Sequence, residues 1–108
     1  MKILEYDAES DSLYVNVSSK KAFLTAELSP RIGVDLSQSK SVVGVELLGA
    51  SKVISELFGS RVPKSKVGKM LCRISDGDAL YLNFELGKKH ASLAIPKTYK
   101  SPVLAAPA

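Results

Sequence analysis

The stretch DSLYVNV, residues 11–17, returns sixty-seven positions later as DALYLNF, residues 78–84. In both copies apolar and polar residues alternate, so every second side chain falls on the same side of an extended chain. One side of the first copy is apolar (Leu13, Val15, Val17), and the other side is polar (Tyr14, Asn16). Each copy is therefore predicted to be a strand with one buried face, entered from an acidic turn residue. A degenerate duplication, with the two copies adjacent in one sheet, is the natural hypothesis.

The same period of two recurs along the chain in short runs separated by turn residues. It predicts further strands at 2–6, 22–28, 31–36, 42–48 and 91–95. Short connections favour antiparallel neighbours, and Asp76–Gly77 predicts a tight two-residue hairpin turn before the second copy. We therefore predict an α+β fold, an antiparallel meander of about seven to eight short strands with one short helix packed on the sheet.

The helix is predicted at about 50–58, where apolar residues form one stripe and Gly59 follows as a helix-closing residue. The basic segment 59–69 is predicted to be a connection or a functional loop. Residues 69–75 fit either a strand or a helix, and the strand is favoured because Met70, Cys72 and Ile74 alternate. The chain is interpreted as one domain, 1–108, with 1–60 and 61–100 as hypothetical β-repeats and 101–108 as an extended tail.

Composition restricts the class of protein. The chain has 108 residues, of which 45% are hydrophobic and 24% charged, as in globular domains. No apolar run approaches the roughly 20 residues that span a bilayer, and the N-terminus turns acidic at Glu5, before a signal peptide could form. A single cysteine, Cys72, favours a reducing compartment. We predict a cytoplasmic protein without a membrane partner, and a homodimer because a small sheet leaves strand edges unprotected.

The net charge of +4 is unevenly distributed. Residues 1–60 carry six Lys or Arg against eight Asp or Glu, whereas residues 61–108 carry nine against three. Such a split is typical of a chain with an anionic partner on one side, or of an ordinary solvated surface. If the segments concerned meet at one end of the sheet, they form a phosphate-contacting patch. The candidate nucleic-acid-binding residues are Arg61, Lys64, Lys66, Lys69, Lys88, Lys89, Lys97 and Lys100.

Other residue patterns predict little chemistry. The acids at positions 7, 9 and 11 lack the glycine and glutamate of a calcium loop. Cys72 and His90 are too few ligands for a structural zinc site, so no metal or cofactor is predicted. Two groups of side chains are candidates for a shared surface. The carboxylates Glu27, Asp35 and Glu46 can converge on one sheet face, and the candidate binding face consists of Tyr14, Asn16, Tyr81 and Asn83.

Two family resemblances add to this interpretation. The stretches YDAESDSLYVNVS (6–18) and ELSPRIGVDLSQSKSVVGVELLGAS (27–51) resemble the family known as domain of unknown function 2283. Its landmarks fall at Tyr6–Asp7, Asp11, Leu13–Tyr14, Gly33, Asp35 and 43–47. The chain departs from the family at 37–41, which lacks an acidic turn, and at Gly49, where the family usually has Asp. The resemblance implies the fold and an antitoxin-like role, and it carries over no catalytic residue.

The second resemblance is fainter. Residues 62–97 are similar to the DNA-binding half of swapped-hairpin regulators and antitoxins, with matches at Val62–Pro63–Lys64, Gly77–Asp78 and Gly87. The function predicted first is a small non-enzymatic protein-binding module, antitoxin-like in role. The alternative is a nucleic-acid-binding regulator that uses the basic second half, and an enzyme is disfavoured because no nucleophile is paired with a base.

Overall fold

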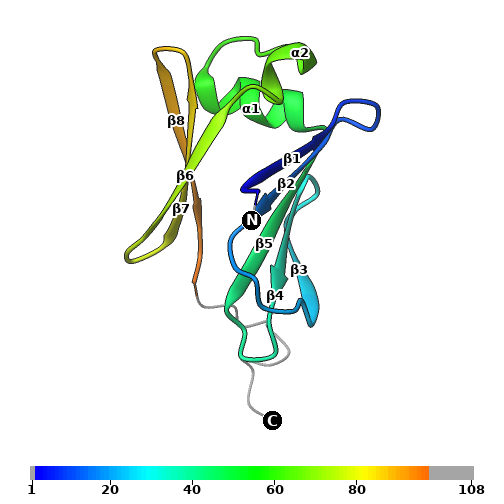
Figure 1. Ribbon diagram of the computed structural model, residues 1–108, viewed down its shortest axis with the longest axis vertical. Helices are drawn as coiled ribbons and strands as arrows, with labels where there is room; N and C mark the ends of the chain where they lie inside the picture. The colour runs from blue at the N-terminus through cyan, green and yellow to red at the C-terminus, as the bar shows by residue number, and fades with distance from the viewer. Residues whose placement is uncertain (1, 98–108) are drawn as a thin grey trace.

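The computed structural model describes residues 2–97, and these residues form two antiparallel sheets and two short helices (Figure 1). The predicted tail at 101–108 lies outside the described residues. A five-stranded sheet, sheet A, has the order β1-β2-β5-β4-β3. A three-stranded sheet, sheet B, has the order β6-β7-β8. The elements are β1 (Leu4–Asp7), β2 (Ser12–Asn16), β3 (Leu24–Ser29), β4 (Ile32–Leu36), β5 (Val42–Leu48), α1 (Ala50–Phe58), α2 (Lys64–Val67), β6 (Leu71–Asp76), β7 (Leu80–Leu86) and β8 (Lys89–Ile95).

The α+β class and the eight antiparallel strands confirm the predicted fold class, but the strands do not form one meander. The repeated strands are β2 and β7, and they lie in different sheets, so the prediction that they are adjacent is wrong. Each is instead the second strand of a hairpin and has a partner on both sides: β2 lies between β1 and β5, and β7 between β6 and β8. The alternation specifies which face is buried, whereas the choice of sheet depends on distant partners.

Sheet B resolves the strand-or-helix alternative. Residues 71–76 form β6, and Met70 and Cys72 are buried on one side of the chain as the strand prediction required. The predicted two-residue turn is wrong, because Asp76 pairs with Leu80 and leaves three residues, 77–79, in the loop. Leu86 pairs with Lys89 across a two-residue turn in which Gly87 has φ 61°, a backbone region open to glycine.

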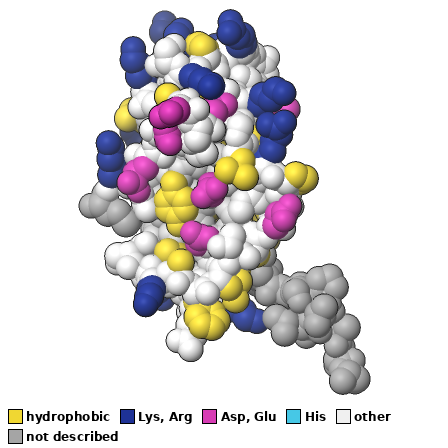
Figure 2. Space-filling model, turned by 90° about the vertical axis from the view of Figure 1, so that its right-hand side faces the viewer, with side chains coloured by type: hydrophobic (Ala, Val, Ile, Leu, Met, Phe, Trp, Pro, Cys, Tyr) yellow, Lys and Arg dark blue, Asp and Glu magenta, His cyan; other side chains and the backbone are white. Residues whose placement is uncertain are grey.

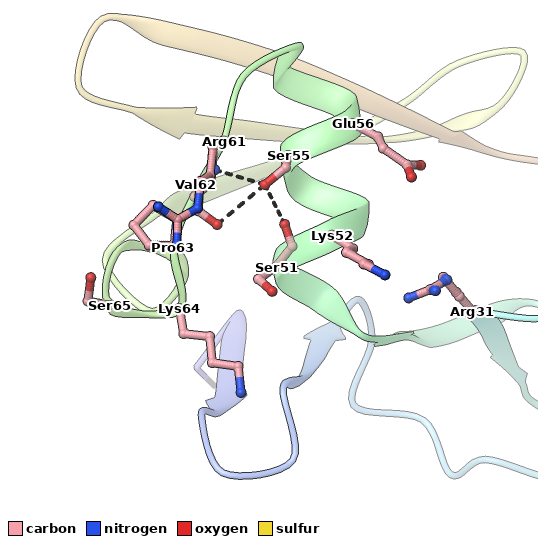
Figure 3. Close-up of a pocket in the computed structure, with 10 residues that line it drawn as sticks. All are labelled: Arg31, Ser51, Lys52, Ser55, Glu56, Arg61, Val62, Pro63, Lys64 and Ser65. Carbon is pink, nitrogen blue, oxygen red and sulfur yellow. Dashed lines mark hydrogen bonds between the residues drawn. The ribbon is translucent and has the colours of Figure 1, made fainter.

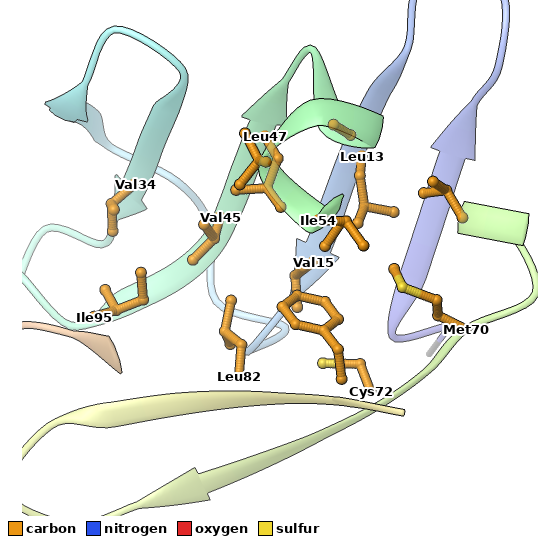
Figure 4. Close-up of a cluster of buried hydrophobic side chains, with 14 of the residues drawn as sticks. Leu13, Val15, Val34, Val45, Leu47, Ile54, Met70, Cys72, Leu82 and Ile95 are labelled. Carbon is orange, nitrogen blue, oxygen red and sulfur yellow. The ribbon is translucent and has the colours of Figure 1, made fainter. Parts of the chain in front are cut away.

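The core lies between the inner faces of the two sheets and is closed at one end by α1 (Figure 4). Leu13 and Val15 of β2 and Val45 and Leu47 of β5 are fully buried. From sheet B, Leu82 and Phe84 of β7 meet them with no exposed area. Both copies of the repeated strand thus direct their apolar residues into one core, which is why the same pattern serves each sheet.

Two short helices follow sheet A and form one end of the molecule (Figure 1). The predicted helix is α1, which buries Ala50, Val53 and Ile54 and ends at Gly59 with φ 69°. A second helix, α2, occupies four residues of the segment predicted to be a loop, and Val67 anchors it in the core. Neither helix, nor any other in residues 2–97, has the length and apolarity needed to traverse a bilayer.

Candidate basic cleft and sheet face

Most of the predicted nucleic-acid-binding residues gather at the end of the molecule formed by the helices. The 59–69 segment and the β7–β8 turn both lie there (Figure 1), and the Lys89 ammonium donates to Ser60 Oγ at 2.7 Å. Two residues from the first half of the chain join them: Arg31 in the β3–β4 turn and Lys52 on α1. We call this cluster the basic end; its members are Arg31, Lys52, Arg61, Lys64, Lys66, Lys69, Lys88 and Lys89, and each is exposed.

Two predicted members are not part of it. Lys97 lies at the opposite end of sheet B, where its ammonium is 2.7 Å from Asp76 Oδ1 and donates to the Gly77 carbonyl at 3.0 Å. Lys100 lies outside the described residues. In contrast, no side chain of the basic end has a carboxylate partner within salt-bridge distance among residues 2–97. Its charges are therefore available to an external anion.

The basic end contains an open cleft of about 780 Å³ between α1 and the segment that leads into α2 (Figure 3). Four cations line it. Lys52 comes from α1 and Arg31 from the β3–β4 turn, while Arg61 and Lys64 come from the opposite wall. Glu56 is the single carboxylate among the lining residues, so the formal charge of the lining is +3 (four cations less one anion). A cleft with such a lining attracts phosphate or another anion.

Ser55 holds the two walls of this cleft together. Its hydroxyl donates to the Ser51 carbonyl at 2.6 Å and accepts the Val62 N–H at 2.8 Å (Figure 3). The side chain of Val62 is buried beneath the loop. These contacts tie residues 61–63 to the second turn of α1 and so set the position of Arg61 relative to Lys52.

The first turn of α1 is held by a residue of the repeated stretch. Gly49 at the N-cap has no side chain to offer, and the Asp11 carboxylate from the β1–β2 turn takes this role. It accepts the Ser51 N–H at 3.0 Å and the Ser51 hydroxyl at 2.7 Å, and Tyr6 donates to it at 2.6 Å. Burial opposes the ionised form, but the hydrogen bonds from Ser51 and Tyr6 outweigh it and hold the pKa of Asp11 below its ordinary value. Lys64 adds a smaller attraction to the same carboxylate.

Glycine at position 49 has a geometric reason. The residue has φ 60°, and a Cβ there would collide with the Arg31 guanidinium. The departure from the family pattern therefore leaves room for Arg31 beside the helix start. No ion pair joins Arg31 to Glu27, Asp35 or Glu46 in the described part of the chain.

The second candidate surface is the outer face of sheet A, which carries Tyr14 and Asn16. Tyr14 crosses over Gly44 of β5, where any Cβ would collide with its ring, and donates to Asp35 Oδ2 at 2.7 Å. Thr25 of β3 donates to the other carboxylate oxygen at 2.6 Å. Burial, and then the bond to Asp35, raise the pKa of Tyr14, so its phenol stays protonated. This face is a fixed hydrogen-bonded network that spans four strands.

The three predicted carboxylates do converge on this face. Glu27, Asp35 and Glu46 line one groove of about 490 Å³, in which Gly33 leaves the centre without a side chain. Figure 2 views this side of the molecule: carboxylates lie over the middle, and Lys and Arg side chains gather at the helical end. The charge separation that the sequence showed between halves is thus a separation between an acidic sheet face and a basic end.

The candidate face of four residues is divided between two surfaces. Tyr81 and Asn83 lie on the outer face of sheet B, because their neighbours Leu82 and Phe84 point into the shared core. Tyr81 donates to Asp78 at 2.7 Å, and Asn83 accepts the Ser92 hydroxyl at 2.7 Å. The structure therefore does not bring Tyr14 and Asn16 together with Tyr81 and Asn83.

Cys72 and His90 lie on opposite faces of sheet B. Cys72 faces the core beside Phe84, whereas His90 is largely exposed and faces Glu85. Burial raises the pKa of the Cys72 thiol to about 11, so it is not ionised near neutral pH. Within residues 2–97 no three His, Cys, Asp or Glu side chains are grouped closely enough to hold a metal ion.

Sequence reasoning missed Arg31 and Lys52 as members of the basic end. Both belong to the acidic half of the chain, and a charge count over each half does not reveal individual basic residues within it. The available signal was local: Lys52 stands on the exposed side of a predicted amphipathic helix, and Arg31 follows Pro30 in a turn.

The segment that forms sheet A is similar to a known protein family. Residues 3–51, which run from the start of β1 into α1, match the family model described as protein of unknown function (DUF2283). This segment is similar to the DUF2283 family. The match confirms the resemblance over the first half of the chain. In this protein the matched segment forms sheet A and the start of α1.

Three curated proteins are also similar to the chain, each named protein nucleotidyltransferase YdiU. Those of Azoarcus sp. (strain BH72) and Rhodopirellula baltica are 30% identical over 81 residues, or 75% of this chain. That of Xanthomonas euvesicatoria pv. vesicatoria is 27% identical over 94 residues. The chain spans only 14–17% of the length of these relatives. No solved structure matches the chain.

Proposed function

We propose that this protein is a non-enzymatic binding module that holds nucleic acid at its basic end. The observation that carries the proposal is the gathering of eight exposed cations from both halves of the chain at the helical end of the molecule. Phosphate backbones bind such surfaces because lysine and arginine displace their condensed counterions. The fainter resemblance of residues 62–97 to swapped-hairpin regulators is consistent with this role.

The proposal does not include the nucleotidyltransferase activity named for the curated relatives, because this chain covers only about 15% of their length. We place the module in the cytoplasm, where Cys72 stays a thiol and nucleic acid is accessible. Its outer sheet faces are then free to contact other proteins while the basic end is occupied.

Anisotropy of a fluorescent DNA duplex, titrated with protein across a range of salt concentrations, tests the proposal. We expect affinity to fall with salt at a log–log slope of several units. Replacing Lys64 and Lys66 with alanine should weaken binding and reduce the slope by about one unit per lysine that contacts a phosphate.

The matched control removes the same charge elsewhere. Lys20 and Lys21 are exposed in the β2–β3 connection, which follows the end of β2 that lies away from α1. Alanine at both should leave the slope unchanged. Equal losses in the two double variants would mean that only net charge matters, and no binding by folded protein at low salt would remove the proposal.

A second candidate function, recognition of another protein, is favoured by strand β3. It is an edge strand of sheet A, and it presents Leu24 and Leu28, each 38% exposed, next to Phe23 at 64%. An edge of this kind can pair with a strand of another chain, although the register shift between Glu27 and Ser29 confines the regular part of β3 to residues 24–27. A second copy of this chain, in an isologous homodimer, is the simplest occupant, and an antitoxin-like partner would use the same edge.

Light scattering after size-exclusion chromatography tests this candidate. We expect a dimer, and we expect Phe23→Lys with Leu24→Lys to yield a monomer because charge on the edge opposes pairing. Leu71→Lys is the control, since Leu71 is 63% exposed on the edge strand β6. A monomeric wild-type protein at high concentration would eliminate the homodimer.

A further inference from the structure

The cleft within the basic end differs from the rest of that surface in shape. Lys66, Lys69 and Lys88 stand on the exterior, where a phosphate could approach from many directions. Arg31, Lys52, Arg61 and Lys64 instead line one open cleft, and they come from three separate segments of the chain. Cations on both walls of a cleft favour an anion that can enter it, such as the end of a strand, over a continuous backbone that passes outside.

The charge of the lining favours a particular kind of phosphate. An internal phosphodiester carries one negative charge, whereas a terminal phosphate monoester carries about −1.5 to −2 near neutral pH. Against a lining of formal charge +3 the monoester gains more attraction and leaves less positive charge uncompensated. Its three terminal oxygens can also accept several charge-assisted hydrogen bonds at once.

The walls are held in place without any ligand. Ser55 links α1 to Val62, and Asp11 fixes the first turn of α1 through Ser51. Because Asp11 already takes the Ser51 N–H and hydroxyl, a bound anion would rely on the side-chain cations and not on the start of the helix. A preformed arrangement of this kind loses less conformational entropy on binding than a flexible basic loop does.

We propose that the α1–α2 cleft is a pocket for a terminal phosphate monoester, and that it recognises the phosphorylated end of a nucleic-acid strand. This inference rests on the proposed function, since it assigns one subsite within the basic end. Backbone phosphates of the same molecule would contact the surrounding lysines, while the cleft would take the end.

Two short duplexes of identical sequence, one with 5′-phosphate ends and one with 5′-hydroxyl ends, test the proposal at fixed salt. We expect the phosphorylated duplex to bind about ten-fold more tightly, a ratio within reach of one charge-assisted hydrogen bond. Millimolar inorganic phosphate, added as a competitor, should reduce this preference more than it reduces binding of the hydroxyl duplex.

Two double variants of equal charge locate the effect. Lys52→Ala with Arg61→Ala changes exposed residues of the cleft and should abolish the preference for the phosphorylated end. Lys66→Ala with Lys88→Ala changes residues outside the cleft lining, and it should weaken both duplexes while the ratio stays the same. Circular dichroism of each variant confirms that the fold is intact.

The outcomes separate this inference from the function on which it rests. Equal, salt-dependent binding of both duplexes would overturn the pocket and leave the nucleic-acid-binding function standing. Failure of both duplexes to bind would overturn both. Tighter binding of a phosphoserine peptide than of the phosphorylated duplex would also overturn the assignment, because the monoester would then belong to a protein.

Discussion

The two copies of the repeated stretch, β2 and β7, are alike toward the core and different toward solvent. Leu13 and Val15 of the first copy, and Leu80 and Leu82 of the second, are buried between the sheets. Both copies also use asparagine in the same way. Asn16 donates to the Lys2 carbonyl and Asn83 donates to the Arg73 carbonyl, and each acceptor lies in the chain segment that precedes the copy. The shared pattern therefore describes a hairpin strand and its buried face.

The acidic residue that opens each copy shows the difference. Asp11 reaches across to α1, where it accepts two bonds from Ser51 and one from Tyr6. Asp78 is exposed in the β6–β7 loop and accepts only from Tyr81 among the side chains described. The aspartate of the first copy thus supports the wall of the basic cleft, and that of the second copy closes a hairpin. The two copies therefore share a strand structure but have different tertiary contacts.

The last residue of each copy should give the largest difference in stability. Phe84 is fully buried, whereas its counterpart Val17 is only partly buried. We expect Phe84→Ala to lower the free energy of unfolding by about 3–5 kcal/mol through lost burial and a residual cavity. Val17→Ala should cost roughly 1 kcal/mol, because the two methyl groups removed are partly in solvent. Urea denaturation measures both, and equal costs would contradict the core described here.

The opening aspartates should differ next. Asp11→Ala removes the acceptor that serves the first turn of α1, and we expect a loss of about 1–2 kcal/mol in urea denaturation. Asp78→Ala should leave the unfolding midpoint unchanged, because the Asp78 side chain has only a local, solvated contact. A midpoint shift in the Asp78 variant as large as that in the Asp11 variant would show that the two turns are equivalent.

The Asp11 contribution should depend on pH. Since the folded state holds the pKa of Asp11 below its unfolded value of about 3.9, ionised Asp11 stabilises the fold above that value. This stabilisation is lost as pH falls through the lower, folded-state pKa. The difference in unfolding free energy between wild type and Asp11→Asn should therefore be constant near neutral pH and shrink below about pH 4. A difference that grows on acidification would have the wrong sign.

The outward tyrosines should differ least. Tyr14→Phe removes the bond to Asp35 that spans β2, β5 and β4, and we expect a loss of about 1 kcal/mol, reduced by the partial exposure of the site. Tyr81→Phe removes a bond within one loop and should not shift the unfolding midpoint measurably. If Tyr81→Phe proved the more costly change, the outer face of sheet B would be the more ordered surface.

The strands were predictable because their signal is local. Alternation at 42–48 identified β5, and the stripe at 50–58 identified α1 almost to the residue. Other features were not predictable in this way. Helix α2 has four residues and too little periodicity to recognise, and it exists because Val67 is buried in the core.

The candidate site was predicted in part for the same reason. Arg61 and Lys64 were identified from the basic character of their own segment. Arg31 and Lys52 were missed because they lie among acidic residues in sequence and reach the cleft only through the β3–β4 turn and α1. Lys97 was wrongly grouped with the basic end, since nothing in its neighbourhood reveals that β8 carries it away to Asp76.

By itself the sequence determined the two strands of the repeat, their buried faces, the single amphipathic helix and the similarity of residues 3–51 to the DUF2283 family. These follow from side-chain direction and backbone preference over a few residues. Only the tertiary structure decided that the copies lie in separate sheets, that Asp11 holds α1, and that four cations share one cleft. Those features depend on which distant segments pack together to bury the common core, and short-range patterns do not encode that choice.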